Sequence, residues 1–232
     1  MLPLLSNKAY RWSLMPQVEN EQVREFWTKE YEGYPYNLRA AAIAPIQNKV
    51  GAFLTNPILN RVLTQAEPID LRRIMDERRI LLVNLAKGHI GGDGAALLGA
   101  LLVASIGWTA FGRADVSEHE RSDFFVYLDE FHDFTTLTLT TMLSELRKYG
   151  VAFVLAHQYL GQLDREIQDA IFGNVGTIVS FRVGHRDAEA LVKELFPMCD
   201  VPDLINLPNY SVYLKLIIDG VPSKPFSATT LS

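Results

Sequence analysis

The sequence predicts an α/β fold: a mostly parallel sheet with helices on both faces, preceded by a helical segment and ending in a β-hairpin. Continuous apolar runs alternate with amphipathic runs along most of the chain, as in parallel sheets covered on both faces. Residues 17–65 instead show helical periodicity. Near the end, two apolar runs flank Asp219-Gly220, a pair typical of hairpin turns. We therefore divide the chain into a helical segment, 1–66, and an α/β part, 67–232.

Length and composition are those of an ordinary globular protein. The 232 residues, of which 48% are hydrophobic and 21% charged, suffice to bury a core. A formal net charge of −5 gives no support to a basic surface along the whole chain, although it does not exclude a local one. The single cysteine, Cys199, cannot form an internal disulfide, so we expect a cytoplasmic setting. His132 and His157 lack the spacing of zinc ligands.

The helical segment is predicted from two stretches. Residues 18–31 open with acidic side chains and carry Val23 and Phe26 at helical spacing. Residues 37–54 form a second helical run, which we expect Pro45 to interrupt.

Four buried strands alternate with helices in the α/β part. Each predicted strand is a short continuous apolar run, and each predicted helix lies between two such runs, as in βαβ units. Gly150 is expected to stop the helix that ends in LSELRKYG. We predict strands at 79–85, 124–128, 151–156 and 176–183, and further helices at 95–112, 164–172 and 186–196.

The run 95–112 has a second interpretation. Its 18 residues carry no charge, which reaches the lower edge of membrane-spanning length. Its Ala- and Gly-rich composition and its place directly after a predicted strand favour a buried crossover helix. A membrane anchor stays open as the alternative.

Two adjacent carboxylates, Asp129 and Glu130, follow the apolar run 124–128. Ligands bind at the carboxyl ends of strands in open α/β sheets. In P-loop ATPases the first carboxylate of such a pair holds Mg²⁺ and the second polarises the attacking water. Because neighbouring strand residues point to opposite faces, both can serve one site only if the chain turns there. The alternative is a plain strand-to-helix connection with an acidic N-cap.

Such an ATPase also needs a glycine-rich phosphate loop, G-x-x-x-x-G-K-[ST]. The sequence contains no Gly-Lys pair. The nearest stretch, AKGHIGGDGAA at 86–96, has Lys87 ahead of its glycines and places Asp93 where a phosphate would lie, so we interpret it as a turn. The chain therefore carries the acidic half of a nucleotide site without the phosphate-binding half.

Two further residues would complement the acidic pair. Gln158 follows the strand predicted at 151–156 and is placed to sense a γ-phosphate or to orient water. Arg147, near a helix end, is placed to reach the nucleotide of a neighbouring subunit as an arginine finger. The alternatives are an ordinary exposed glutamine and a helix-end arginine favoured by the helix dipole.

The order and spacing of these motifs resemble the motor domain of conjugative coupling ATPases, the TraG/TraD-type proteins of type IV secretion, within the FtsK–HerA division of RecA-like ATPases. The resemblance extends over roughly residues 17–230 and is carried by DERRILLVNLAKG, FFVYLDEFHDF, LSELRKYGVAFVLAHQYLGQL and AIFGNVGTIVSFRVGHRDAEAL. It implies an incomplete RecA-like (P-loop NTPase) sheet. It also implies that Asp129 and Glu130 close the Mg–ATP site, that Arg147 is the arginine finger, and that Gln158 is the family's glutamine.

The resemblance implies partners as well. Family members form hexameric rings that use ATP to drive single- or double-stranded DNA toward the secretion machinery. The implied cofactors are ATP and Mg²⁺, and the implied partners are DNA, relaxosome proteins, among them the TraM-type protein, and type IV secretion proteins. The implied setting is the cytoplasm, at the inner face of the bacterial cytoplasmic membrane.

The departure from the family concerns the phosphate loop. In the family this loop lies upstream of a helical region, and residues 1–65 resemble the tail of that region. We therefore expect a fragment, or the product of a split or truncated gene, with ATPase activity only when an upstream phosphate-loop segment completes it. The alternative is a docking module for relaxosome or secretion partners that has no nucleotide role.

Overall fold

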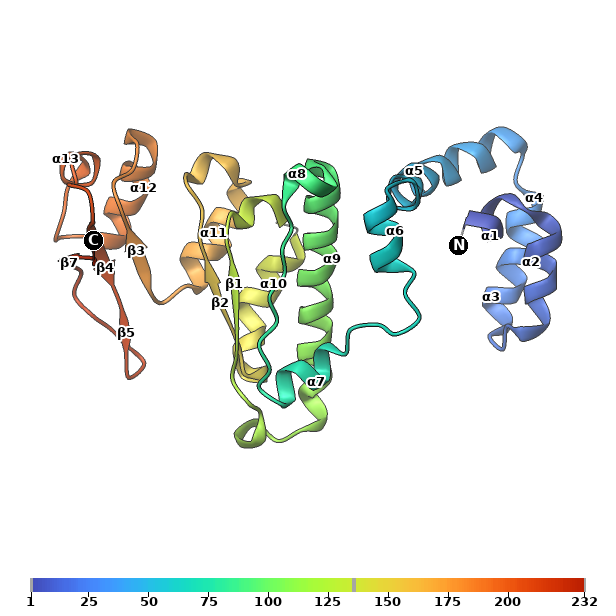
Figure 1. The fold of residues 1–232 in the computed structure, drawn as a ribbon, viewed down its shortest axis with the longest axis horizontal. Helices are drawn as coiled ribbons and strands as arrows, with labels where there is room; N and C mark the ends of the chain where they lie inside the picture. The colour runs from blue at the N-terminus through green and yellow to red at the C-terminus, as the bar shows by residue number, and fades with distance from the viewer. Residues whose placement is uncertain (1, 135–136, 232) are drawn as a thin grey trace. The chain divides into compact units, whose positions relative to one another are not determined.

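The computed structural model describes residues 2–134 and 137–231. Contacts between residues divide the chain into two units (Figure 1). The helical unit comprises the residues up to Pro68 together with Ala86–Gly94, and the α/β unit comprises Ile69–Leu85 together with the residues from Ala95 onward.

The helical unit is a set of mostly short helices, and a buried arginine, Arg11, joins residues 4–5 to residues 31–32. The Arg11 guanidinium donates to Glu32 Oε1 through Nε (3.1 Å) and to the Leu4 carbonyl through Nη1 (2.6 Å). It also lies over the ring of Tyr31, whose hydroxyl donates to the Leu5 carbonyl. The helices are α1 (Leu2–Ser6), α2 (Lys8–Leu14), η1 (Met15–Gln17), α3 (Glu21–Glu25), the π-helical η2 (Phe26–Glu30), α4 (Tyr31–Gly33), α5 (Tyr36–Thr55), α6 (Pro57–Leu63) and α8 (Lys87–Ile90).

The predicted interruption at Pro45 is wrong, because α5 continues through it. Proline removes one backbone donor from a helix, but the preceding Arg-Ala-Ala-Ala stretch consists of strong helix formers that tolerate the loss of one bond. The stretch AKGHIGGDGAA contains one short helix, α8, and then Gly91 at φ 78°, a left-handed value that glycine adopts without strain. Asp93 lies in the first turn of the next helix, as its negative charge favours.

The α/β unit is built around two parallel strands, β1 (Phe124–Leu128) and β2 (Val151–Leu155), which pair in register over their whole length. Gly150, at φ 72°, ends the preceding helix and leads into β2, as predicted. Both strands have their predicted positions. The surrounding helices are α7 (Leu71–Asp76), α9 (Gly92–Phe111), η3 (Gly112–Asp115), η4 (Glu118–Glu120), η5 (Phe131–Phe134), α10 (Leu137–Glu145), η6 (Leu146–Tyr149), η7 (Leu160–Gln162) and α11 (Arg165–Asn174) (Figure 1).

The main core lies between these two strands and their helices. Alternate strand residues point to this core, and Val126 and Val151 are buried in it while Phe125 and Tyr127 remain exposed. The helices contribute the other buried side chains, among them Met75, Val103, Ile106, Leu139, Met142, Ile167 and Ile171.

The parallel sheet is smaller than predicted. No strand forms at 79–85, where Ile80 and Leu82 are 88% and 89% exposed and no strand of the described residues pairs with them. An extended segment becomes a strand only when a neighbouring strand pairs with its backbone groups, and among the described residues no strand lies beside 79–85. The fourth predicted strand, 176–183, forms as β3 (Ile178–Ser180) but pairs antiparallel with β4 (Ser211–Lys215), so the predicted parallel continuation is wrong.

The C-terminal elements form a second, antiparallel sheet and the predicted hairpin. Strand β4 pairs on its other side with β7 (Phe226–Thr229), while β5 (Ile217–Ile218) and β6 (Val221–Pro222) form the hairpin. Asp219 and Gly220 turn the chain between β5 and β6 with φ values of 51° and 79°, as predicted. Helices α12 (His185–Leu195) and α13 (Val201–Ile205) pack on this region through a small core of Ala188, Leu195, Cys199, Leu204 and Leu207.

Helix α9 is long and apolar enough to cross a membrane by length and composition, and 33% of its most apolar window is buried. One face joins the core, where a Cβ at Gly107 would come within 2.2 Å of Met142. The opposite face exposes Leu101 and Trp108. One side of α9 therefore packs in the core of the α/β unit.

Candidate functional site

The predicted acidic pair follows the end of β1, next to the end of β2. We call this end of the two strands the carboxyl edge; it comprises Asp129, Glu130, Gln158 and their neighbours. Backbone pairing continues just beyond the strands, since Ala156 N donates to the Leu128 carbonyl (2.9 Å) and Phe131 N to the Ala156 carbonyl (3.2 Å). Between these two bonds the chain turns at Glu130, whose φ is 48°. This is the turn that two adjacent residues need in order to serve one site.

Three side chains meet at this turn. Gln158 Nε2 donates to Glu130 Oε1 (2.6 Å), and Asp129 Oδ1 accepts the backbone amide of Glu130 (3.0 Å). Asp129 and Gln158 are exposed, and the Glu130 side chain is 35% exposed. Three of the four residues predicted from the sequence to form a site therefore lie together, with polar atoms open to solvent.

Two neighbours of the pair were missed as site residues in the sequence analysis. His132 lies with Nδ1 3.4 Å from Glu130 Oε2 and with Nε2 3.2 Å from Gln162 Nε2. The Asp133 carboxylate oxygen Oδ1 is 3.6 Å from His132 Nε2. From the sequence, His132 was weighed only as a metal ligand. Its position two residues after Glu130 was the available signal, but only the turn at Glu130 brings the two side chains together.

Arg147 lies elsewhere. It belongs to η6, which leads into the beginning of β2, whereas the acidic pair follows the end of β1. Because β1 and β2 are parallel and in register, five residues of strand separate the two ends, roughly 15 Å. Arg147 is exposed, and its side chain makes no hydrogen bond or ion pair with the residues that the structure describes. Arg147 therefore does not contact the acidic pair of its own chain.

The opposite end of the strands, which we call the amino edge, holds a second polar network around Arg113. This guanidinium is fully buried and donates to Asp76 Oδ1 (3.0 Å), to the Tyr149 carbonyl (2.8 Å) and to the Ser122 carbonyl (2.9 Å). Burial acts to raise the pKa of Asp76, but hydrogen bonds and charge from Arg72 and Arg113 hold that pKa below its ordinary value. Each Arg113 nitrogen thus has a partner, as in a structural tie.

The oxygen-bearing side chains of the carboxyl edge suit a hard cation such as Mg²⁺. Mg²⁺ in nucleotide sites takes one or two protein carboxylates, and its other ligands are water and phosphate oxygens. Asp129 is an exposed carboxylate with one oxygen engaged by an amide, which suits that role. Among the described residues no group of three or more His, Cys, Asp or Glu side chains forms a closed metal site. No Gly-Lys pair exists to grip a triphosphate.

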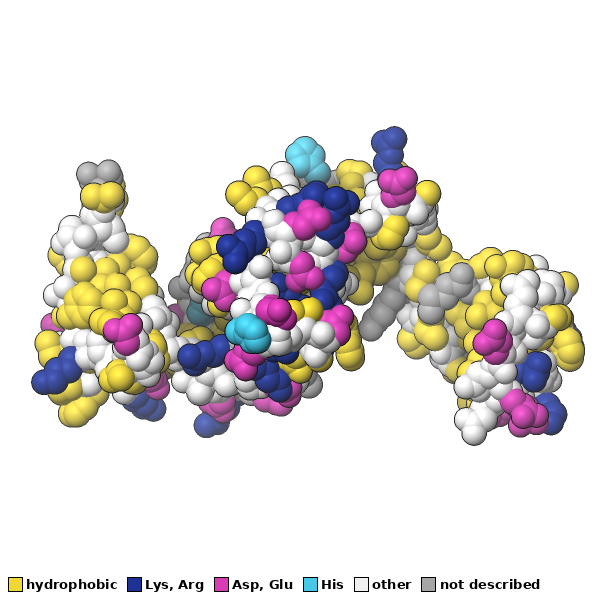
Figure 2. Space-filling model, turned by 90° about the horizontal axis from the view of Figure 1, so that it is seen from below, with side chains coloured by type: hydrophobic (Ala, Val, Ile, Leu, Met, Phe, Trp, Pro, Cys, Tyr) yellow, Lys and Arg dark blue, Asp and Glu magenta, His cyan; other side chains and the backbone are white. Residues whose placement is uncertain are grey.

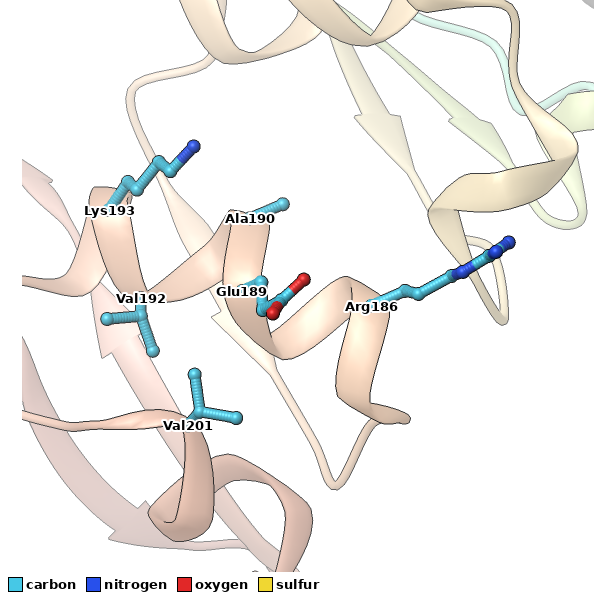
Figure 3. Close-up of a pocket in the computed structure, with 6 residues that line it drawn as sticks. All are labelled: Arg186, Glu189, Ala190, Val192, Lys193 and Val201. Carbon is cyan, nitrogen blue, oxygen red and sulfur yellow. The ribbon is translucent and has the colours of Figure 1, made fainter.

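A separate open hollow lies on α12 and α13 and contains none of the predicted site residues (Figure 3). Two cationic side chains, Arg186 and Lys193, flank it along α12, with Glu189 between them. Its apolar lining comes from Ala190, Val192 and Val201.

Charges of both signs are mixed on the face seen in Figure 2. Charges are also paired within the α/β unit, where Arg72 bonds Asp76 and Asp115. Arg73 likewise bonds Glu77. This mixture agrees with the net charge of −5 and gives that face no single-sign basic patch.

Comparison with protein families decides the relationship of the central segment. Residues 123–195 match the family model described as the TraM recognition site of TraD and TraG. The match begins just before β1, contains all four predicted site residues and ends with α12. It confirms the resemblance to TraG/TraD-type coupling proteins in this segment, which is roughly a third of the chain. A comparison with curated proteins gives no match.

Proposed function

We propose that the chain is the C-terminal part of an ATP-driven, DNA-translocating coupling protein of conjugation and type IV secretion, with an incomplete RecA-like domain. The observation that carries this proposal is the meeting of Asp129, Glu130 and Gln158 at one turn beyond two parallel strands. The match of the same segment to TraD and TraG supports it.

The three residues have distinct proposed roles. Asp129 holds Mg²⁺, Glu130 orients and polarises the attacking water, and Gln158 senses the γ-phosphate. The bound metal would offset negative charge on the phosphates. The bond from Gln158 to Glu130 supports a shared task, because it links the ends of both strands through side chains.

Arg147 is proposed as an arginine finger that acts on a neighbouring subunit of a hexameric ring. Its place at the amino edge, exposed and roughly 15 Å of strand from the acidic pair, supports action in trans rather than within one chain. A finger of this kind is worth about 10³-fold or more in related phosphoryl transfers. Rings mixed from Arg147→Ala subunits and Glu130→Gln subunits, each inactive alone, should recover activity, because some interfaces then contain both native residues. Mixed rings without recovery would refute the trans role.

Completion of the site tests the proposal as a whole. The chain alone should bind a fluorescent ATP analogue in Mg²⁺ weakly or not at all, because phosphate-loop amides and lysine supply most of the grip. ATPase activity should appear when a phosphate-loop segment of a TraG/TraD-type protein is supplied by upstream fusion or in trans. Micromolar binding by the chain alone, or no activity from a stable, folded fusion, would count against the proposal.

The second candidate function is a docking module for relaxosome proteins that does not use nucleotide. The matched family is described as a TraM recognition site, which favours this candidate. A relaxosome protein of the TraM type should then be captured by the chain alone, and Asp129→Ala should not change the capture. If no TraM-type protein is captured under conditions where the chain is folded, this candidate fails.

A further inference from the structure

We propose that His132 is a positioning residue that fixes the orientation of the Glu130 carboxylate. This inference rests on the proposed function for its mechanistic meaning, since it assumes that Glu130 acts on water. The contacts that carry it do not depend on that function. They are the approach of His132 Nδ1 to Glu130 Oε2 and of Gln162 Nε2 to His132 Nε2.

The two oxygens of Glu130 meet different partners. Oε1 accepts from the Gln158 amide at 2.6 Å. Oε2 is buried and makes no hydrogen bond of ordinary geometry with a described residue, and the His132 ring nitrogen Nδ1 lies 3.4 Å from it. A buried carboxylate oxygen without a donor is costly, so a small closure of this gap is favoured. Glutamine and histidine would then hold the carboxylate from two sides.

The polar groups that face the two ring nitrogens of His132 determine which nitrogen carries the proton. The Gln162 amide nitrogen can only donate, so the ring nitrogen that it meets at 3.2 Å, Nε2, must accept. The single proton of a neutral ring then resides on Nδ1, the ring nitrogen 3.4 Å from Glu130 Oε2, which can only accept; in the structure these two atoms do not yet meet in hydrogen-bond geometry. The Asp133 oxygen, 3.6 Å from Nε2, is beyond hydrogen-bond distance. The contacts with Glu130 and Gln162 are consistent with one arrangement of protons.

The position of Glu130 explains why an orienting partner is needed. Its backbone lies at φ 48°, and its side chain is 35% exposed, so solvent reaches one side of the carboxylate. An exposed carboxylate samples several rotamers, whereas water activation needs one orientation. His132 is only 16% exposed and can hold that orientation from the buried side.

The tautomer of His132 provides a test without nucleotide. Long-range ¹H–¹⁵N correlation spectra of the whole chain at alkaline pH should show His132 with its proton on Nδ1, whereas an unconstrained neutral imidazole prefers Nε2. Glu130→Ala should shift His132 toward the Nε2 form. His185, an exposed ring 3.3 Å from Glu189 across one helical turn, is the matched control and should not change in Glu130→Ala. A wild-type His132 with its proton on Nε2 would overturn the inference.

Kinetics of the completed ATPase separate positioning from mere packing. His132→Ala should lower kcat about 10- to 100-fold, the usual cost of losing an orienting partner, with little change in KM for ATP. His132→Gln, whose amide can donate to the carboxylate, should restore part of kcat. Equal kcat in His132→Ala and wild type, or no difference between the Ala and Gln variants, would overturn the inference. Failure of the proposed function is distinct, because Glu130→Gln would then leave turnover intact whatever the spectra show.

Discussion

The two ends of the β1–β2 pair carry polar networks of opposite character. At the amino edge, Arg113 is fully buried and each of its nitrogens has a partner. At the carboxyl edge, Asp129 and Gln158 are exposed, and Glu130 lies in left-handed backbone that a non-glycine residue adopts at a cost. Both networks sit on the same two strands. The network at the amino edge therefore stabilises the fold, whereas the network at the carboxyl edge includes a backbone conformation that costs stability.

This difference separates structure from function. A network that serves the fold saturates its hydrogen bonds and excludes water, because unsatisfied buried groups destabilise the protein. A network that serves a ligand keeps polar atoms open and tolerates local strain, since residues held in rare backbone conformations gather at functional sites. On both criteria the carboxyl edge is the candidate site, and the amino edge is a tie between α7, η3 and the strands.

Loss of the Arg113 guanidinium should have the largest effect on stability. Arg113→Met keeps most of the buried stem but leaves the Tyr149 and Ser122 carbonyls without their donor. We expect the free energy of unfolding in urea to fall by about 3–5 kcal/mol, as for other broken buried charge networks. Arg147→Ala, which removes an exposed arginine on the same edge, is the matched control and should stay within about 0.5 kcal/mol. A loss below about 1 kcal/mol for Arg113→Met would remove the contrast between the two edges.

Asp76, at the amino edge, should make the stability of the protein depend on pH in the acid range. Its pKa is lowered in the folded protein, so the folded state binds fewer protons than the unfolded chain as the pH falls. The stabilisation is therefore present above the ordinary carboxyl pKa and is lost as the pH falls through the lowered value. Because the Asp76 side chain is 40% exposed, solvent screens its ion pairs, so Asp76→Asn should cost only about 0.5–1 kcal/mol at neutral pH and should flatten this acid loss. Parallel acid-denaturation curves for Asp76→Asn and wild type would contradict the assignment.

At the carboxyl edge we expect a substitution to raise the free energy of unfolding instead of lowering it. Glu130→Asn replaces a residue at φ 48° by one that adopts left-handed backbone more readily, so unfolding should cost about 0.5–1 kcal/mol more than in the wild type. Asp129→Asn, at the next position along the chain, changes charge without this relief and should leave stability within about 0.5 kcal/mol. Thermal and urea unfolding measure both variants. A destabilised Glu130→Asn would show that Glu130 serves the fold.

The sequence predicted the elements with strong local signals and missed those decided by distant partners. Strands β1 and β2 were correct, because each is a short apolar run ended by turn or polar residues, and the Asp219-Gly220 hairpin was correct because both residues favour positive φ. The run 79–85 is also short and apolar, but no strand of the described residues lies beside it, and its own sequence gives no sign of that difference. The antiparallel direction of β3 depends likewise on β4, about thirty residues later along the chain.

The residues of the candidate site also fall into those that the sequence predicts and those that only the fold brings together. Asp129, Glu130 and Gln158 were predicted because each follows a strand, and parallel strands bring their carboxyl ends together. The contact of His132 with Glu130 depends on one backbone turn, and the burial of Arg113 depends on Asp76, 37 residues away in the chain. Such contacts arise from tertiary packing, for which spacing in a single sequence carries no signal.

The most direct test of the central claim compares ATP affinity with turnover in the protein completed by a phosphate-loop segment. If the carboxyl edge is the acidic half of a nucleotide site, Glu130→Gln should abolish turnover while ATP affinity in Mg²⁺ stays within about twofold, because its role is felt in the transition state. Asp129→Asn should weaken Mg²⁺-dependent ATP binding about tenfold or more, because the metal loses a charged ligand. Wild-type affinity and wild-type turnover in both variants would contradict the claim and leave the carboxyl edge without a nucleotide role.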